Sequence, residues 1–282
     1  MSRNNQERIG APKSAAPAPP ITQSAEGFSF ATPTEFVDLP TAGKYYPEGH
    51  PLRGKDSVEI RYMTAKDEDI LSSKTLLQKG VALDRLIQSV LVDKTIDINS
   101  LYVGDKNAIL VAARVTGYGE VYEAKTTCPS CMANVNFEYD LSKVSVKHGD
   151  KWADYAIRKH TEDRFIVTLP HTGVDVEVRL LTSRDEDYLS ELRENKKKRK
   201  LPETNLTDQL RMIVCSVNGH SDPKSLQAFV DGLPARDSRY LRTAYELLVP
   251  NIDMTQEFSC ASCGHTQEVT VPLTAGFFWP DR

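Results

Sequence analysis

An internal repeat constrains the fold of this chain more than any other feature of its sequence. Residues 59–72 (EIRYMTAKDEDILS) and 177–190 (EVRLLTSRDEDYLS) align without a gap and are identical at eight of 14 positions. Such self-similarity indicates that one structural unit occurs twice. Further matches follow in the same order: LPTAG at 39–43 with LPHTG at 169–173, Ser89-Val90 with Ser216-Val217, DINSL at 97–101 with DPKSL at 222–226, and CPSC at 128–131 with CASC at 260–263. Shared turn and cap chemistry is the alternative to duplication, and the repeated Cys-x-x-Cys favours duplication.

The length of the chain is consistent with two such units. A chain of 282 residues holds about two ordinary domains of roughly 150 residues each. Its first 27 residues contain APKSAAPAPP and few apolar side chains, a composition that cannot form a core. We therefore expect a disordered N-terminal arm at 1–27, a first repeat unit at 28–143, a linker at 144–163, a second repeat unit at 164–273, and an aromatic tail at 274–282.

Each unit is expected to open with a β-hairpin that leads into a capped helix. In the second copy, residues 164–169 and 174–181 are typical of two strands around a Pro-His-Thr-Gly turn. A Thr-x-x-Asp motif follows at residues 64–67 and again at 182–185. This motif is a capping box, in which the threonine and the acid satisfy free amides at the start of a helix. The sequence thus predicts a helix start at both places.

The middle of each unit is expected to be helical. Apolar residues at helical spacing predict helices near 83–91 and 106–115 in the first copy, and near 206–217 and 238–248 in the second. Cys215 lies on the apolar stripe of one of them, where a lone cysteine is usually a small apolar core residue. Together with the closing hairpins, these elements predict an α+β fold of two tandem duplicated units related by a pseudo-twofold axis.

Four of the five cysteines form two pairs, Cys128 with Cys131 and Cys260 with Cys263. Each pair precedes an alternating strand, an arrangement typical of a zinc knuckle in which two thiolates bind one metal. The two knuckles of a local zinc ribbon are separated by roughly 15–20 residues, and here the separation is much longer. We expect the pseudo-twofold axis to bring the two hairpins together around one structural zinc with four thiolate ligands.

Two alternatives to a shared zinc remain at this stage. The cysteines could be free thiols, or they could be redox-active pairs. A redox Cys-x-x-Cys opens a helix after a strand, whereas both pairs here precede strands. Gly264 follows the second pair at a position that favours a left-handed backbone, and Met132 occupies the equivalent position in the first copy. The methionine weakens the signature of one knuckle.

Charge and hydropathy exclude several functional classes. The net charge is −4, from 35 basic and 39 acidic residues, so no overall cationic field attracts nucleic acid or anionic lipid. The basic run KKKRK at 196–200 could neutralise phosphates, but no aromatic residues lie between its cations to stack on bases. No stretch has the roughly 18 apolar residues of a membrane span. We expect no membrane insertion, and nucleic acid is not an expected partner.

No set of residues in the sequence suggests an enzyme. The histidines are scattered, and no nucleophile, base and acid stand out together, so we expect neither catalytic residues nor a small-molecule substrate. Phe277, Phe278 and Trp279 make the C-terminal tail strongly aromatic, and aromatic side chains often anchor protein interfaces. These three residues are candidate partner-binding residues, and folding back onto the core is the alternative.

Four segments resemble baseplate hub proteins of contractile-tailed bacteriophages of the T-even type. They are LPTAGKYYPEGHPL at 39–52, VEIRYMTAKDEDIL at 58–71, GVALDRLIQSVLVD at 80–93 and TTCPSC at 126–131. The resemblance implies a structural, non-enzymatic component of the virion tail baseplate, made in the host cytoplasm, with other baseplate, hub or tail proteins as partners. Two other functions stay open: a zinc-ribbon regulator that binds nucleic acid through residues 196–200, and a baseplate assembly chaperone absent from the mature particle.

Overall fold

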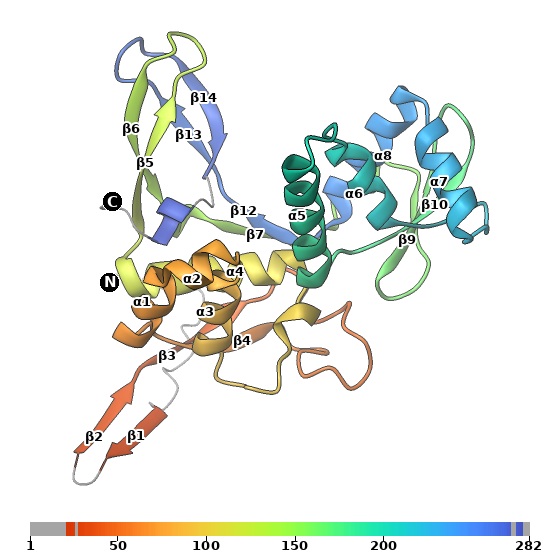
Figure 1. Cartoon of the computed structure of the whole chain (residues 1–282). Coiled ribbons are helices and arrows are strands. Elements are labelled where there is room, and N and C mark those ends of the chain that lie inside the picture. Colours follow the sequence, from red (N-terminus) through yellow and green to blue (C-terminus); the bar gives the residue numbers. More distant parts are fainter. Residues whose placement is uncertain (1–20, 26–27, 272–274, 279–282) are drawn as a thin grey trace, which may run out of the picture.

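A computed structural model describes residues 21–25, 28–271 and 275–278 of the chain. Helices and small antiparallel sheets alternate along it, which confirms the expected α+β class. Figure 1 shows the helices of the first half and those of the second half side by side in the body of the molecule, while two β-hairpins rise together from the body. The two halves contain similar elements in a similar order.

The first half begins with a hairpin, continues with helices and ends with a second hairpin. Its elements are β3 (Thr34–Asp38), β4 (Ser57–Arg61), α1 (Ala65–Ser72), α2 (Lys74–Gln78), α3 (Ala82–Val90), the 3-10 helix η1 (Ile98–Ser100), α4 (Val103–Tyr118), β5 (Val121–Thr127) and β6 (Asn134–Asp140). β3 pairs with β4 and β5 pairs with β6, both antiparallel. The long helix α4 leads directly into the closing hairpin.

The second half follows the same plan. Its elements are β8 (Ile157–Lys159), β9 (Arg164–Thr168), β10 (Asp175–Arg179), α5 (Ser183–Lys198), α6 (Asn205–Ile213), β11 (Val214–Val217), α7 (Pro223–Gly232), α8 (Ala235–Leu248), β13 (Thr255–Ser259) and β14 (Thr266–Thr270). The opening hairpin β9–β10 is extended by β8 and β11 into a four-stranded sheet of order β11-β10-β9-β8. The closing hairpin is β13–β14.

Short elements join and flank the two halves. β1 (Ile21–Ala25) and β2 (Phe28–Thr32) form an antiparallel hairpin, so residues 21–25 of the arm expected to be disordered are in a strand. η2 (Leu141–Lys143), β7 (Ser145–Lys147) and β8 occupy the expected linker or its neighbourhood. β7 pairs with β12 (Asn251–Asp253), and η3 (Ala275–Phe278) is the last described element. The exit of the first half thus pairs with the approach to the last hairpin.

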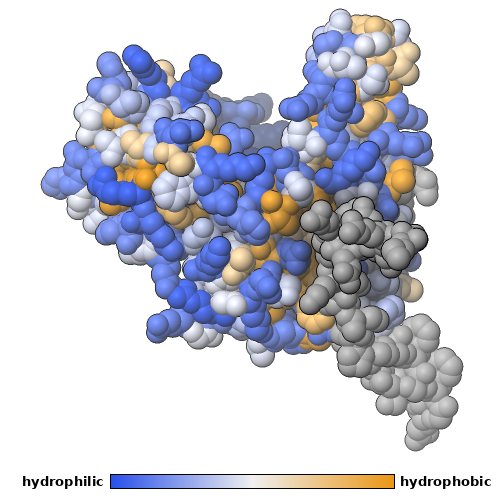
Figure 2. Space-filling model, turned by 180° about the vertical axis from the view of Figure 1, so that it is seen from behind, coloured by the Kyte–Doolittle hydropathy of each residue, from blue (hydrophilic) through white to orange (hydrophobic). Residues whose placement is uncertain are grey.

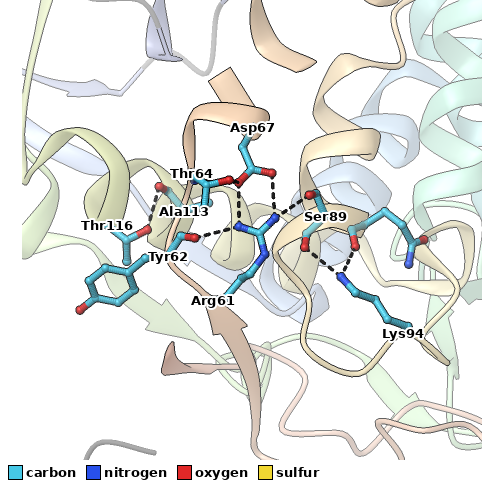
Figure 3. Close-up of polar contacts among 9 residues, drawn as sticks. Arg61, Tyr62, Thr64, Asp67, Ser89, Lys94, Ala113 and Thr116 are labelled. Atoms are coloured by element: carbon cyan, nitrogen blue, oxygen red, sulfur yellow. Dashed lines mark hydrogen bonds and ion pairs between the residues drawn. The ribbon is translucent and has the colours of Figure 1, made fainter. Parts of the chain in front are cut away.

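The two capping boxes are confirmed, and each includes an arginine from the preceding strand. Both threonine caps show the reciprocal bonds of a capping box with the acid three residues later. The Arg61 guanidinium donates to the two Asp67 carboxylate oxygens at 2.7 and 3.0 Å (Figure 3). The Arg179 guanidinium donates to Asp185 at 2.8 Å through both nitrogens. One bidentate pair therefore ties strand to helix in each half.

In each half, one buried carboxylate anchors the turn of the opening hairpin. Asp105, in the first turn of α4, accepts from the Thr41 amide at 3.0 Å and from its hydroxyl at 2.6 Å. Asp237, in the first turn of α8, accepts from the Thr172 amide at 3.0 Å and from its hydroxyl at 2.7 Å. Both carboxylates are fully buried, and buried charges of this kind require such partners.

The helix expected near residues 206–217 ends earlier than its apolar spacing suggests. α6 stops at Ile213, and Val214–Val217 form β11, which pairs with β10. Cys215 therefore lies on an edge strand rather than on a helix. Val214 and Val217 are β-branched and favour an extended backbone, and the open edge of β10 supplies the hydrogen bonds that stabilise it. Periodicity alone does not reveal that edge.

One hydrophobic core extends through both halves. Where they meet, the Val103 amide donates to the Leu181 carbonyl at 3.2 Å and the Ser183 amide to the Leu101 carbonyl at 2.7 Å. Beside this contact, the buried Lys106 ammonium donates to the Ser183 hydroxyl at 2.8 Å and lies 2.9 Å from an Asp84 oxygen. The halves are therefore one body rather than two separable domains.

Stability should depend on Asp67 in a pH-dependent manner. Burial raises the pKa of this carboxyl, but bonds from Arg61, Ser89 and Thr64 outweigh burial and lower the pKa to about 2. Its pKa in the unfolded chain is about 3.9, so its contribution is complete above that pH and is lost as the pH falls toward 2. Urea unfolding should show Asp67→Asn less stable than wild type by about 2 kcal/mol at pH 7. A difference that stays constant down to pH 3 would contradict this.

Candidate metal centre

The two closing hairpins pack together and carry the four paired cysteines at their turns. We call these hairpins, residues 121–140 and 255–270, the cysteine lobe. The rings of Phe137 and Phe258 meet edge to face with centroids 5.2 Å apart, and Phe258 is fully buried. Cys128 and Cys260 complete this small core. Figure 2 shows the lobe projecting from the rest of the surface, with hydrophobic and hydrophilic side chains mixed on it.

The four sulfur atoms converge at the end of the lobe. The Sγ atoms of Cys128, Cys131, Cys260 and Cys263 all lie within 4.8 Å of one another. The contacts Cys128–Cys263 and Cys131–Cys260 both measure 3.8 Å, and both cross from one hairpin to the other. A tetrahedral zinc with Zn–S bonds of about 2.3 Å places its sulfurs about 3.8 Å apart. The cluster therefore has the dimensions of one four-thiolate site.

The turns that present the cysteines have the same geometry in both hairpins. The Met132 amide donates to the Cys128 carbonyl at 2.9 Å, and the Gly264 amide donates to the Cys260 carbonyl at 2.9 Å. Both donors have a left-handed backbone, with φ of 59° at Met132 and 70° at Gly264. The methionine thus adopts the conformation that glycine adopts in the other hairpin, at a cost of about 1 kcal/mol. Its presence does not disrupt the knuckle.

The environment of the thiols differs between the inner and outer positions. Cys128 and Cys260 are buried, whereas Cys131 and Cys263 are exposed. Burial raises the pKa of the Cys260 thiol, but the Cys263 and Ser262 amides and neighbouring thiols lower it to about 6. The Ala133 amide lowers the pKa of Cys131, but the adjacent cysteine sulfurs raise it to about 11. Four thiol ligands leave no coordination position for water, which suits a structural metal rather than a catalytic one.

The described part of the aromatic tail lies against the first half. Phe277 and Phe278 are 1% and 2% exposed, and the Phe277 ring meets the Tyr122 ring edge to face at 5.1 Å. Trp279 lies outside the described residues. The tail was expected either to bind a partner or to fold back onto the core. In the single chain, Phe277 and Phe278 fold back onto the core.

A buried arginine that the sequence analysis did not single out holds this tail. Arg114 on α4 is 1% exposed, and its guanidinium donates to the carbonyls of Phe277 at 2.7 Å, Gly119 at 2.8 Å and Val121 at 3.1 Å. Its charge also lies 5.2 Å from the centre of the Tyr118 ring. In the sequence, the signal that could have identified this arginine is a lone cation within the apolar run AILVAARV at 108–115.

A serine–histidine contact elsewhere has a structural geometry rather than a hydrolytic one. His50 Nε2 lies 2.8 Å from the Ser100 hydroxyl, and His50 Nδ1 accepts from the Leu52 amide. Because Nδ1 accepts, Nε2 carries the proton and donates to Ser100, and that hydroxyl in turn donates to the Asp97 carbonyl at 2.5 Å. A general base needs a free Nε2 lone pair facing the nucleophile. The pair therefore fixes a loop.

Most of the sequence matches a known family. A family model described as T4 bacteriophage base plate protein matches residues 34–279, a range that includes both halves and the four clustered cysteines. The chain belongs to the T4 bacteriophage base plate protein family. Comparison with curated proteins gave no match to this baseplate protein, and comparison with solved structures gave none either.

Membership in this family places the baseplate protein in the virion tail, with other phage tail or baseplate proteins as its partners. The resemblance seen in the sequence is thereby confirmed for the baseplate, while the hub within it stays a prediction. A structural family of this kind favours a non-enzymatic role. Among the described residues, no helix combines the length and apolar character needed to cross a membrane.

Proposed function

We propose that this protein is a structural component of the baseplate hub, that it binds neighbouring subunits through its N-terminal arm and C-terminal tail, and that one zinc ion joins its two halves. The family match over residues 34–279 is the observation that carries the structural role. Residues 1–33 lie outside the matched range and contain the proline-rich segment. Such a segment can become ordered when it wraps around a partner.

The proposed zinc site uses Cys128, Cys131, Cys260 and Cys263. Its support is the distance of 3.8 Å between sulfurs of opposite hairpins, together with matching turns on both sides. Zinc with four thiolate ligands supplies folding energy and no open position for chemistry. In this role the ion ties the end of the first half to the end of the second.

Support for the proposed duplication comes from networks that occur twice. The Arg61–Asp67 pair has its counterpart in Arg179–Asp185, at the same place before and inside a helix. The two buried carboxylates that hold a hairpin turn, in α4 and α8, are a second repeated feature. A single ancestral unit explains both networks and the paired cysteines, because each feature then arose once.

The C-terminal tail can reach a partner in two ways. Phe277 and Phe278 are buried against the chain's own first half, so a partner reached through the tail contacts either the segment from Trp279 onward or the two rings after their release. A hub subunit that exchanges its tail between its own core and a neighbour would be held in the assembly without a large preformed interface.

Purified virions should contain this protein in a fixed ratio to other baseplate proteins. Quantitative mass spectrometry of mature particles and of isolated baseplate intermediates is the measurement. A resident structural component is retained in both, because its contacts are part of the finished assembly. Presence in intermediates together with absence from mature particles would support the assembly chaperone instead and reject the resident role.

The same preparation tests the arm. A variant lacking residues 1–20 is expected to keep its thermal unfolding temperature and its zinc content, because the core begins later in the chain. It should nevertheless be depleted from purified baseplates relative to wild type. Equal incorporation of the two proteins would remove the arm from the proposal while leaving the zinc and the structural role intact.

A further inference from the structure

Helix α5 is longer than the core requires. Its counterpart α1 has 8 residues, whereas α5 has 16, from Ser183 to Lys198. Ser183, at its first position, is the only buried residue of α5. Figure 1 shows α5 beside α6, on the side of the second-half helices that faces the cysteine lobe, with its C-terminal end at the loop that leads into α6. The second half of α5 therefore has no buried residue and contributes little to core packing.

The C-terminal end of α5 is strongly basic and is held in one conformation. The Lys196 ammonium donates to Asp208 and Thr204, which ties the helix end to α6. The chain then turns at Lys200, whose φ is 52°, and the Leu201 amide returns to the Lys196 carbonyl at 2.9 Å. Lys196 is thus paired within the chain, and this pairing positions the cations that follow it.

Three of the four remaining cations have no acidic partner in the described chain. Lys198 lies 3.5 Å from Glu194 on the same exposed surface. Lys197, Arg199 and Lys200 are exposed, and none of them forms an ion pair with another residue of the described chain. Cations at a helix C-terminus also balance its negative dipole, but one or two suffice for that effect. Three unpaired charges on a fixed turn leave a local positive field on an otherwise acidic protein.

Two exposed leucines adjoin these charges in the sequence. Leu201 is 50% exposed and follows the turn directly, and Leu206 is 42% exposed in the first turn of α6. Phosphate neutralisation does not use apolar side chains of this kind, and no aromatic ring is available within residues 193–206 to stack on a base. The exposed Glu203 adds a charge that repels phosphate. This combination of cations, exposed leucines and a glutamate is better suited to binding another protein than to binding nucleic acid.

We propose that Lys197, Arg199, Lys200, Leu201 and Leu206 form a docking surface, the basic tip, for an acidic segment with apolar side chains on a neighbouring baseplate protein. This inference rests on the proposed structural role and adds a third contact to the arm and tail. Its charge selects an acidic partner and speeds encounter, while the leucines contribute apolar contact once the surfaces meet.

Incorporation into baseplates tests the basic tip directly. The gene is removed from the phage and supplied during infection as wild type or as the triple variant Lys197→Gln, Arg199→Gln, Lys200→Gln. A matched variant, Lys66→Gln, Lys74→Gln, Lys79→Gln, removes the same charge from exposed positions in α1, in α2 and directly after α2. With protein supply limiting, we expect the triple variant to be incorporated about tenfold less than wild type, as three partner ion pairs imply, and the matched variant to be incorporated normally.

Cross-linking identifies what the basic tip contacts. A zero-length carbodiimide joins lysine amines to carboxylates only where they touch. In purified baseplates we expect Lys197 or Lys200 to be joined to an aspartate or glutamate of another baseplate protein. The Leu201→Ser, Leu206→Ser variant should lose that product while keeping its fold, because both side chains are already exposed.

The outcomes separate this inference from the proposed function. If wild type itself is absent from purified baseplates, the structural role is wrong. Wild type and triple variant incorporated equally, with cross-links confined to the chain's own Glu194 or Glu203, would overturn the basic tip alone. Salt-dependent binding of duplex DNA by the purified protein that weakens in the triple variant would overturn it in favour of nucleic acid, since the slope reports released counterions.

Discussion

Replacing Cys128 or Cys260 by serine is expected to remove zinc from the protein and to lower its stability by about 4 kcal/mol. A metal bound by both hairpins closes a loop of more than 100 residues, and a cross-link of that span contributes about 4 to 5 kcal/mol in chain-entropy terms. For a chain of this size the loss corresponds to a fall in Tm of about 10 °C. Elemental analysis of reduced wild-type protein should show one zinc per chain.

A site shared by both hairpins also predicts that the effects of the two substitutions are not additive. Each single variant already breaks the one site, so the double variant Cys128→Ser, Cys260→Ser should be little worse than either single variant, because coupled residues are not additive. Cys215→Ser is the matched control, since Cys215 lies outside the cluster and should leave zinc content unchanged. Two zinc ions per chain, no zinc in freshly purified reduced protein, or additive effects of the two substitutions would refute a shared centre.

Arg114→Met should release the C-terminal tail and cost about 3 to 5 kcal/mol of stability. The substitution keeps much of the side-chain volume but removes the donors to the carbonyls of Phe277, Gly119 and Val121. Buried acceptors left without donors cost about 1 to 3 kcal/mol each. Urea unfolding measures the loss, and carboxypeptidase digestion, which should reach Phe277 sooner in the variant, reports the release of the tail.

Two further variants make the Arg114 result specific. Arg114→Lys keeps the positive charge but not the fork of guanidinium donors, so its effect should be intermediate. Arg85→Met removes an exposed arginine from α3 and should change neither stability nor digestion. A tail that is digested at the wild-type rate in Arg114→Met would show that the aromatic contact of Phe277 with Tyr122 holds it without the arginine.

Local chemistry made part of this fold predictable. The capping boxes at Thr64 and Thr182 were correct because a cap depends on residues within one turn. The extent of α6 was not predictable, because β11 forms on a sheet edge that comes from a strand far back in the chain. The role of Arg114 was hidden for the same reason, since its partner Phe277 lies 163 positions further along.

The basic run at 196–200 was likewise predictable from the sequence only in part. Its composition allowed contact with phosphates, and the absence of interleaved aromatics already disfavoured nucleic acid. Only the structure shows that Lys196 binds Asp208 within the chain, that Lys197, Arg199 and Lys200 form no ion pair within the described chain, and that Leu201 and Leu206 are exposed. Exposure and pairing are properties of neighbours in space.

The sequence by itself determined the α+β class, the helix starts and the resemblance to baseplate proteins, because these follow from short-range patterns and shared motifs. It also named the four cysteines, since a Cys-x-x-Cys pair is recognisable within four residues. Whether those pairs come together was decided by the tertiary structure, which brings sulfurs separated by up to 135 positions to 3.8 Å. The physical reason is that a metal site depends on distances between atoms, and distant segments acquire these distances only when both halves pack on one core.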